Sequence, residues 1–463
     1  MKKLIFTIIL LLFCGLESYS SISMSPYLQA VTTNSIYVCV ECSTADTVTV
    51  NYGITTSFGL TAKTTLISTT AGGTYVHKIK LINLTTNTLY YYQAVQGSST
   101  STTSNFHSAV LPGTSFRFLA FGDCRSNTTP HGQISVNMLA ANGLFSVYYG
   151  DYCVDDGYTT WKNEFFIADE LALDAKVPFM SVPGNHESWG PNNKAWVYNP
   201  STSSGTQDYY SFDYGDVHFV CINNYVDYSV GNAQYNFVMN DLSNTTRRWK
   251  IAIFHEPAYS YGGHGSNTTM QSWCTNVLIP KGVDLVLNGH NHFYQHCLAN
   301  GLHHFIIGGG GAPLYTPGTG TYLVKSAQSY CYGVFDETPN SLKLTVYSNT
   351  NSLIDTITFN KPPAGINFNN ETTKISYKLY QNYPNPFNPS TKIKFDVLQG
   401  KNTNVSLVVS DVEGKTIAVL VNEQLNNGTY EVTFDGSKLA SGIYFYKLQA
   451  GNFSEVKKLM LVK

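Results

Sequence analysis

Five short hydrophobic runs in the middle of the chain each end beside a polar residue that can bind a metal. Short apolar runs bounded by glycine and turn residues are typical of buried parallel strands. Ligands of open α/β sheets collect beyond the carboxyl ends of such strands, so we expect the five endings to meet at one crevice. The runs are residues 116–122 before Asp123, 145–150 before Asp151, 177–184 before Asn185 and His186, 249–254 before His255, and 283–289 before His290 and His292.

The same pattern predicts three folded parts. Residues 21–110 are rich in Thr, Val, Tyr and Ser, and their strand-like runs at 35–40, 47–52, 75–81 and 89–95 predict a β-sandwich. In residues 111–360 strands alternate with helical patterns such as 161–173 and 232–242, which indicates the α/β class. Residues 361–373 open with Lys-Pro-Pro-Ala-Gly and predict a linker. Residues 374–463 predict a second all-β unit, with runs at 392–397, 405–409, 416–421, 430–434 and 443–448.

Charge is sparse and nearly balanced, with 28 Lys and Arg against 30 Asp and Glu in 463 residues. Because there is no basic excess, we expect no nucleic-acid partner. The surface must be made polar mostly by Ser, Thr, Asn, Gly and Tyr, as in many exported proteins. The length and the apolar content of 43% are sufficient for two or three cores.

The first 20 residues have the pattern of a signal peptide: Lys2 and Lys3, an apolar stretch at 4–13, and Ser18 and Ser20 spaced like a cleavage site. The apolar stretch is shorter than the roughly 20 residues that span a bilayer. No second segment could span a membrane, so we expect no integral membrane segment after cleavage. A lipoprotein anchored through Cys14 is less favoured, because Phe13 stands where a small residue is normally required.

Eight of the nine cysteines remain after removal of Cys14 with the signal peptide. Eight cysteines allow on the order of 100 pairings, and an exported context permits disulfides. Cys39 and Cys42 lie three apart in a strand-like run, so they point to opposite faces and should not pair. For Cys124 and Cys153, beside the proposed ligands, a buried thiol or a disulfide is favoured over metal binding.

The polar endings supply two carboxylates, one carboxamide and three imidazoles. This mixed donor set suits Zn, Fe or Mn, whereas Ca²⁺ prefers an all-oxygen shell. Asp151 is the natural bridge between two cations, because Gly150 leaves room for close approach and Asp155 and Asp156 follow. His290 and His292 are two apart, so one turn can serve both metals. A lone aspartate after a strand is usually a cap, but capping requires neither the histidines nor the Asn185–His186 pair.

The order of these motifs resembles the calcineurin-like metallophosphoesterase superfamily over residues 25–360. The residues that carry the resemblance are Gly122-Asp123, Gly150-Asp151, Gly184-Asn185-His186-Glu187, His255 and Gly289-His290-Asn291-His292. The purple acid phosphatase-like branch fits best, because Pro26-Tyr27-Leu28-Gln29 opens a fibronectin type III-like sandwich and residues 305–315, with four glycines, follow the last histidine motif. The resemblance implies a β-sandwich core flanked by helices, with an all-β sandwich domain at each end.

The resemblance also implies roles for single residues. His186 would lie just outside the metals as a proton donor or a phosphate-orienting group. His264, nine residues after His255, is either a second substrate-facing histidine or a surface loop histidine. The first metal would be held by Asp123, Asp151 and His292, and the second by Asp151, Asn185, His255 and His290.

Two positions depart from the family pattern. Arg125 stands where the superfamily often has histidine, and a guanidinium cannot ligate a metal. Arg125 either clamps a phosphate oxygen or forms a salt bridge with a nearby carboxylate such as Asp155. Val154 stands where the purple enzymes have an iron-binding tyrosine, and Tyr152 is one strand step away. We therefore expect no purple colour, and the identity of the metals stays open.

The C-terminal unit resembles the sorting domain of type IX secretion. The resemblance rests on Tyr-Pro-Asn-Pro-Phe-Asn-Pro-Ser-Thr at 383–391, Gly-Ile-Tyr-Phe-Tyr at 442–446 and the run at 457–463. It implies the type IX secretion machinery as a partner and a secreted or cell-surface location. An appended β-sandwich that binds glycan is the alternative, and the C-terminal position favours sorting.

Together these features predict an exported two-metal phosphoesterase that hydrolyses phosphomonoesters. Two metals would acidify a water molecule and polarise the phosphoryl oxygens, and His186, helped by His264 or Arg125, would protonate the leaving alcohol or neutralise oxygen charge. A phosphodiesterase or nucleotide hydrolase on the same metal core is one alternative. A non-catalytic surface binding protein with a degenerate metal site is another.

Overall fold

The computed structural model describes residues 22–188, 190–201, 203–361, 366–369, 377–397, 403–425, 428–451 and 453–463. The predicted signal peptide at 1–20 lies outside the described residues. The chain divides into two compact units, Met1–Thr338 with Leu342–Thr358, and Pro339–Ser341 with Phe359–Lys463. In the part of the chain that the structure describes, no helix is both long enough and apolar enough to cross a membrane.

A ten-stranded sheet joins the N-terminal strands to the strands that precede Asp123, Asp151 and Asn185. β1 pairs in parallel with β12 at Gln29 and Phe179, so the two regions share one sheet. The predicted boundary at residue 110 therefore lies inside one compact unit. In sheet order the strands are β22 (Leu353–Asn360), β21 (Ser341–Ser348), β20 (Cys331–Thr338), β10 (Phe116–Phe121), β11 (Phe145–Tyr148), β12 (Phe179–Ser181), β1 (Tyr27–Gln29), β2 (Ser35–Cys42), β6 (Tyr75–Ile82) and β5 (Leu66–Thr69).

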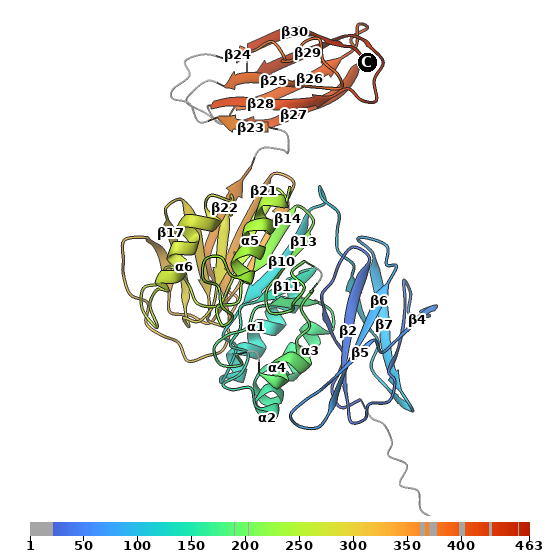
Figure 1. Ribbon diagram of the computed structural model, residues 1–463, viewed down its shortest axis with the longest axis vertical. Helices are drawn as coiled ribbons and strands as arrows, with labels where there is room; N and C mark the ends of the chain where they lie inside the picture. The colour runs from blue at the N-terminus through green and yellow to red at the C-terminus, as the bar shows by residue number, and fades with distance from the viewer. Residues whose placement is uncertain are drawn as a thin grey trace, which may run out of the picture. The chain divides into compact units, whose positions relative to one another are not determined.

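The N-terminal strands of this sheet face a second, five-stranded layer, and Figure 1 shows these blue strands beside the cyan and green elements of the same unit. Val38 and Ile79 in one layer and Val50 and Tyr92 in the other are fully buried. The predicted all-β region at 21–110 is therefore built from two packed layers. The second layer consists of β4 (Leu60–Lys63), β3 (Thr49–Gly53), β7 (Leu89–Gln96), β8 (Ser99–Thr100) and β9 (Ser104–His107).

A seven-stranded sheet carries the strands before His255 and His290. Its inner face packs on the ten-stranded sheet through aromatic rings: Phe219 meets Phe118 and Phe145 edge to face, with ring centroids 5.3 and 5.6 Å apart. The two sheets therefore form a β-sandwich with a shared core. In sheet order the strands are β13 (Tyr210–Tyr214), β14 (Val217–Cys221), β15 (Trp249–Ile253), β16 (Leu285–Asn288), β18 (Leu302–Ile307), β17 (Tyr294–Ala299) and β19 (Leu323–Ala327).

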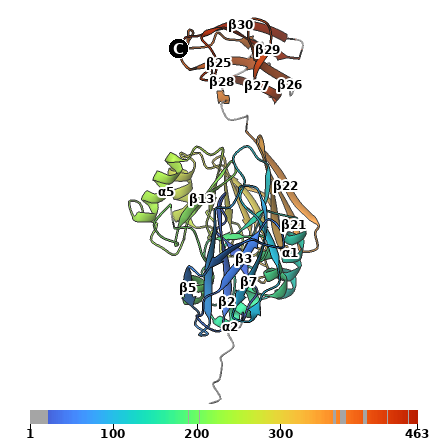
Figure 2. The same ribbon diagram turned by 90° about the vertical axis from the view of Figure 1, so that its right-hand side faces the viewer.

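Helices flank this sandwich on both sides, as Figure 2 shows for α5 and α1. Ile134 and Met138 of α1 belong to the core cluster of the ten-stranded sheet, and Val238 and Leu242 of α5 to that of the seven-stranded sheet. The predicted fold class, a β-sandwich core flanked by helices, is confirmed. The helices are α1 (Thr128–Ala140), α2 (Tyr158–Thr160), α3 (Ala168–Asp174), α4 (Pro191–Trp196), α5 (Ala233–Asn244) and α6 (Thr268–Trp273), with π-helical turns η1 (Trp161–Phe165) and η2 (Cys274–Leu278).

The two predicted helices differ in outcome. The pattern at 232–242 forms α5, with Asn232 as its N-cap accepting a hydrogen bond from the backbone of Tyr235 at 3.0 Å. The pattern at 161–173 is broken into η1 and α3. Trp161, Phe165 and Phe166 are all buried, and the wider π turn together with the break lets all three rings enter one aromatic cluster.

The second unit contains two four-stranded sheets around its own core, which includes the fully buried Ile393, Leu407 and Tyr446. β23 pairs with β28, so the predicted linker at 361–373 contains a strand of this unit. The sheets consist of β23 (Ile366–Asn369), β28 (Gly428–Asp435), β25 (Ser390–Val397) and β24 (Lys378–Leu379), and of β27 (Thr416–Leu425), β26 (Thr403–Ser410), β29 (Gly442–Ala450) and β30 (Phe453–Leu461).

Candidate metal centre

The predicted ligands follow five strand ends, and the structure brings them together. β10, β11 and β12 are parallel neighbours in one sheet, and β15 and β16 are parallel neighbours in the other. The two groups meet where Nε2 of His255 lies 3.4 Å from Oδ1 of Asp151. The site therefore lies where the carboxyl ends of both sheets converge.

Three of these residues adopt left-handed backbone conformations. The φ angles are 59° for Asp123, 56° for Asp151 and 69° for His290. Such conformations cost about 1 kcal/mol or more for a residue with a side chain, and they cluster at functional sites. Hydrogen bonds hold the turns in place: Asp123 N donates to Gly150 O at 2.9 Å, and His290 N donates to the Asp123 carboxylate at 2.9 Å.

Asn185, His255 and His290 form one compact donor group. Asn185 Oδ1 lies 3.2 Å from His255 Nε2 and 3.0 Å from His290 Nδ1, and the two imidazole nitrogens are 3.3 Å apart. Donors about 2.1 Å from a tetrahedral Zn²⁺ would be about 3.4 Å apart, so this spacing fits a cation. His255 Nδ1 donates to Tyr149 O at 2.5 Å, which leaves Nε2 as an acceptor facing the group. Burial first lowers the pKa of His290 to about 3, which keeps its imidazole neutral for binding.

Asp123 and His292 form the first donor group, named after the first predicted metal, and Asp151 lies between it and the second donor group of Asn185, His255 and His290. His292 Nδ1 donates to Pro313 O at 2.8 Å, so its Nε2 is free and lies 3.8 Å from Asp123 Oδ1. Burial first lowers the pKa of His292 to about 4. Burial and the charge of Asp151 raise the pKa of Asp123, a cost that a bound cation would offset. Ligand atoms of Asp123, Asp151 and His255 all lie within 4.8 Å of one another.

Both carboxylate oxygens of Asp151 have basic neighbours. Burial alone would raise its pKa, but interactions with His255, His186 and Arg125 outweigh burial and lower it. Gly184 is required beside it, because a Cβ there would collide with Asp151 Oδ1. The carboxylate is therefore ionised and closely surrounded, as expected of a bridging ligand.

Arg125 contacts the donor groups rather than its predicted partner. Its Nε lies 3.7 Å from Asp151 Oδ2, and a terminal nitrogen lies 3.4 Å from His292 Nε2. The predicted alternative of a salt bridge with a nearby carboxylate is observed, but the partner is Asp151 rather than Asp155, whose Oδ1 accepts a hydrogen bond from Gly157 N at 2.8 Å. A permanent positive charge therefore lies beside the first donor group.

Both predicted catalytic histidines border the cluster. His186 Nδ1 donates to Val154 O at 2.8 Å, and its Nε2 lies 3.7 Å from Asp151 Oδ2. The ring of His264 stacks on that of His290 with centroids 4.3 Å apart. His264 is exposed, so it occupies the solvent side of the metal-ligand cluster.

Three residues that organise the site were not assigned roles from the sequence. Glu187 is buried and accepts hydrogen bonds from the backbone of Gly184, Asp151 and Tyr152, and burial raises its pKa to about 8. Its only signal is its place in the Gly-Asn-His-Glu motif. Glu164 accepts from Ser126 N at 3.0 Å and Val154 N at 2.9 Å, which ties the Arg125 and Asp151 loops together. Tyr315 lies against His292 and His264.

The cysteines and tyrosines near the site take no part in the donor groups. All eight described cysteines are buried free thiols, so the buried-thiol alternative is observed for Cys124 and Cys153. Tyr152 is buried and donates to Val182 O at 3.2 Å, and Val154 is 42% exposed. The Tyr152 hydroxyl therefore donates to the backbone, and the side chain of Val154 has no atom that could bind a metal.

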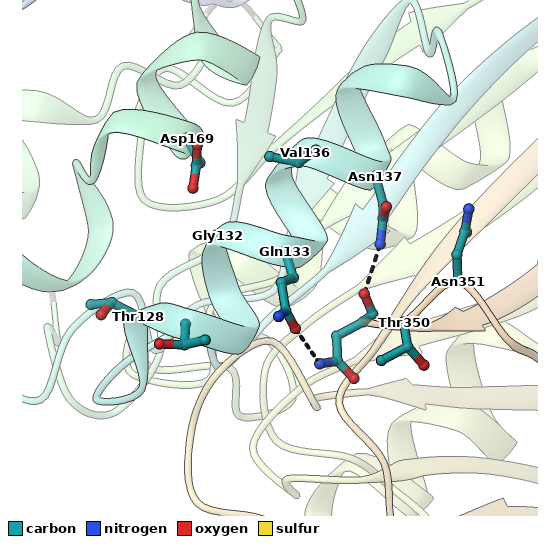
Figure 3. Close-up of a pocket in the computed structure, with 10 residues that line it drawn as sticks. Thr128, Gly132, Gln133, Val136, Asn137, Asp169, Thr350 and Asn351 are labelled. Atoms are coloured by element: carbon teal, nitrogen blue, oxygen red, sulfur yellow. Dashed lines mark hydrogen bonds between the residues drawn. The ribbon is translucent and has the colours of Figure 1, made fainter.

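Cavities do not by themselves mark this site. A cavity of about 620 Å³ lies between α1 and the loop at 349–351, where Figure 3 shows Gln133 and Asn137 hydrogen-bonded to that loop. None of the predicted ligands lines it. A smaller cavity of about 100 Å³ is lined by Glu256, His264 and His290, directly beside the donor groups. The smaller cavity is therefore the one of these two that adjoins a predicted ligand.

Comparison with known proteins agrees with this geometry. Residues 117–294 match the calcineurin-like phosphoesterase family, and residues 381–463 match the secretion system C-terminal sorting domain. Purple acid phosphatase 15 of Arabidopsis thaliana is 28% identical over 272 residues, half of each chain. Purple acid phosphatase 23 of the same plant is 34% identical over 167 residues, 33% of this chain and 36% of the relative. The chain thus spans between about a third and a half of these relatives. The solved structure of PhoD superposes with a TM-score of 0.56 at 13% identity, covering 74% of this chain and 93% of PhoD, which shows the fold alone.

Proposed function

We propose, from the premise that residues 117–294 form a calcineurin-like phosphoesterase domain with purple acid phosphatase homologues, that this metal-dependent phosphoesterase is a two-metal phosphatase acting on phosphomonoesters. One observation carries the proposal. Ligand atoms of Asp151, of Asp123 from the first donor group and of His255 from the second all lie within 4.8 Å of one another, and His255 Nε2 lies 3.4 Å from Asp151 Oδ1.

The donor set fits two cations. Asp123, Asp151 and His292 would hold one, and Asp151, Asn185, His255 and His290 the other. When bound, two cations supply Lewis acidity that acidifies water and polarises phosphoryl oxygens. Zn, Fe and Mn all accept this mixture of oxygen and nitrogen donors.

The remaining side chains would act on the substrate. His186 is fixed by its Nδ1 hydrogen bond to Val154 O, so its Nε2 can deliver a proton to the leaving alcohol or bind a phosphoryl oxygen. Arg125 would neutralise charge on the equatorial oxygens from the first-metal side. His264, on the solvent side of His290, would contact the leaving group.

The chain also carries a secretion system C-terminal sorting domain at 381–463, which indicates export. We propose that the type IX secretion machinery recognises this domain and delivers the enzyme to the cell surface or the medium. Its substrates would then be phosphate esters outside the cell.

Parallel assays of one protein preparation test the proposal. The full chain, loaded with Zn²⁺ or Mn²⁺, is assayed with p-nitrophenyl phosphate and with bis(p-nitrophenyl) phosphate, and its metal content is measured. We expect two bound metals and faster hydrolysis of the monoester, abolished in Asp151→Ala. Faster hydrolysis of the diester would instead assign a phosphodiesterase. Two bound metals without hydrolysis of either ester would assign a binding protein.

A further inference from the structure

We propose that Tyr315 is a positioning residue of the metal centre. Its ring would hold the ligand His292, and its hydroxyl would hold His264 against His290. The kinetic part of this inference rests on the proposed phosphatase function, whereas the metal-binding part requires only that the donor groups bind a metal.

The Tyr315 ring covers His292. The two rings are stacked with centroids 4.2 Å apart and an angle of 19° between their planes. Tyr315 N donates to His292 O at 3.1 Å, and His292 Nδ1 donates to Pro313 O at 2.8 Å. The segment from Pro313 to Tyr315 therefore fixes both the orientation and the tautomer of this imidazole, so that Nε2 faces Asp123.

The Tyr315 hydroxyl reaches the other side of the site. It lies 3.2 Å from Nε2 of His264, whose ring meets the Tyr315 ring edge to face with centroids 5.4 Å apart. His264 in turn stacks on His290. One continuous row of rings thus runs from His292, in the first donor group, through Tyr315 and His264 to His290, in the second.

His264 needs such a partner because of the loop that carries it. Gly262, Gly263 and Gly265 flank it, all with positive φ angles of 98°, 57° and 78°. The backbone of a glycine-rich loop has more conformational freedom, which makes it harder to hold the His264 side chain in one position. Backbone contacts hold this loop against the Tyr315 segment: Gly262 bridges Pro317, and Gly318 N donates to Tyr261 O at 2.8 Å. Tyr315 extends that attachment to the imidazole itself.

The two proposed roles belong to different parts of the Tyr315 side chain, namely the ring and the hydroxyl. Tyr315→Phe removes the hydroxyl and keeps the ring, whereas Tyr315→Leu removes both. A merely space-filling Tyr315 would tolerate Phe without any kinetic effect. The double variant Tyr315→Phe/His264→Ala tests whether the hydroxyl acts through His264, because effects that share one partner are not additive.

The experiment uses the full chain. Two quantities are measured for each variant: the Zn²⁺ retained after dialysis against a mild chelator, and kcat and KM for the hydrolysis of p-nitrophenyl phosphate. For Tyr315→Phe we expect wild-type Zn²⁺ retention, unchanged KM and a kcat lowered about tenfold. For Tyr315→Leu we expect Zn²⁺ affinity at one site to fall by about 10-fold or more, as is usual when a partner that orients a ligand is lost. The double variant should match His264→Ala alone. Tyr322→Phe, a nearby tyrosine outside the site, is the matched control and should behave as wild type.

Each role has an outcome that overturns it. The hydroxyl role is excluded if Tyr315→Phe has the wild-type kcat. It is also excluded if, in the double variant, the loss of kcat caused by Tyr315→Phe multiplies with the loss caused by His264→Ala. Wild-type Zn²⁺ retention in Tyr315→Leu removes the ring role, and thermal melting separates a failure to fold from a loss of metal. If the wild-type chain binds Zn²⁺ but hydrolyses neither ester, the phosphatase proposal fails, while the retention of Zn²⁺ by the two Tyr315 variants still decides the ring role.

Discussion

The guanidinium Nε of Arg125 lies 3.7 Å from Oδ2 of Asp151, so the carboxylate proposed to bridge two cations already has a positive neighbour. The same guanidinium lies 3.4 Å from Nε2 of His292. Its charge competes with a cation for these two donors, and the first metal has only Asp123, Asp151 and His292 as protein ligands. We therefore expect the first metal to be the weaker one.

Arg125→His should tighten that first metal. The change removes a permanent charge and adds an imidazole nitrogen, so Zn²⁺ should resist chelator dialysis at about tenfold higher chelator concentration. If Arg125 also clamps phosphate, the variant should show a raised KM or a lowered kcat even at saturating Zn²⁺. Arg117→His, whose arginine pairs with Asp336 away from the site, is the matched control. Unchanged Zn²⁺ affinity and kinetics would reduce Arg125 to an ion-pair partner of Asp151.

The variants Asp151→Ala and Asn185→Ala should differ in the number of metals that they bind. Asp151→Ala removes the carboxylate shared by both donor groups, so both metals should weaken and activity should disappear. Asn185→Ala removes a donor that contacts only His255 and His290 among the described ligands, so one metal should remain. Elemental analysis after gel filtration measures the difference. Full metal content and wild-type turnover in Asp151→Ala would contradict the bridging role.

His186→Ala should separate chemistry from metal binding. A lost general acid or base typically lowers kcat by about 10²–10⁴-fold. The two metals should remain, because His186 is not among the predicted ligands and its Nε2 lies 3.7 Å from Asp151 Oδ2. Parallel measurement of kcat and metal content checks this. An equal loss of metal would make His186 a ligand.

A second ionic cluster predicts a pH dependence of stability. When protonated, His218 donates from Nδ1 to Asp213 on β13 and from Nε2 to Asp241 on α5, both at 2.7 Å, and Arg247 pairs with Asp213. Burial would lower the pKa of His218, but the hydrogen bonds to Asp213 and Asp241 outweigh burial and raise it. A raised folded pKa contributes stability that is fully present below the unfolded value of about 6.5 and is lost as the pH rises through the folded pKa.

The difference in melting temperature between wild type and His218→Gln measures this contribution. We expect the wild type to be the more stable at pH 6 and the difference to shrink as the pH rises to 9. A difference that is independent of pH would mean that His218 stabilises the fold only by packing.

Removal of the C-terminal unit should leave the enzyme intact and block its export. The cut belongs after Lys361, because β23 pairs with β28 and a cut at residue 381 would leave β23 without its partner strand. We expect the shortened protein to keep its melting temperature and metal content and to accumulate in the periplasm. Export of the shortened protein would refute the sorting role.

The hydrophobic pattern was sufficient to predict the five strand ends, because each run is local and ends in its ligand. The pattern could not predict that Asp151 is the partner of Arg125. Asp155 is also close in sequence, but its carboxylate accepts a hydrogen bond from Gly157 N, and Asp151 is presented by a turn with positive φ. Glu164 and Tyr315 were missed for the same reason. Their contacts join loops that are far apart in the sequence, such as Ser126 to Glu164, and no periodicity records them.

The pairing of β1 with β12 gives the N-terminal region a protective function. Without β1, the edge of β12 would expose unpaired backbone groups, and open strand edges invite aggregation. The same strand also anchors the loop beyond β12, since Gln29 Oε1 accepts from Tyr198 N at 3.0 Å and Tyr27 donates to Trp196 O at 2.7 Å. A catalytic region cut free at residue 110 should therefore aggregate, and grafting it onto an unrelated N-terminal domain should fail unless the graft supplies a strand to close that edge.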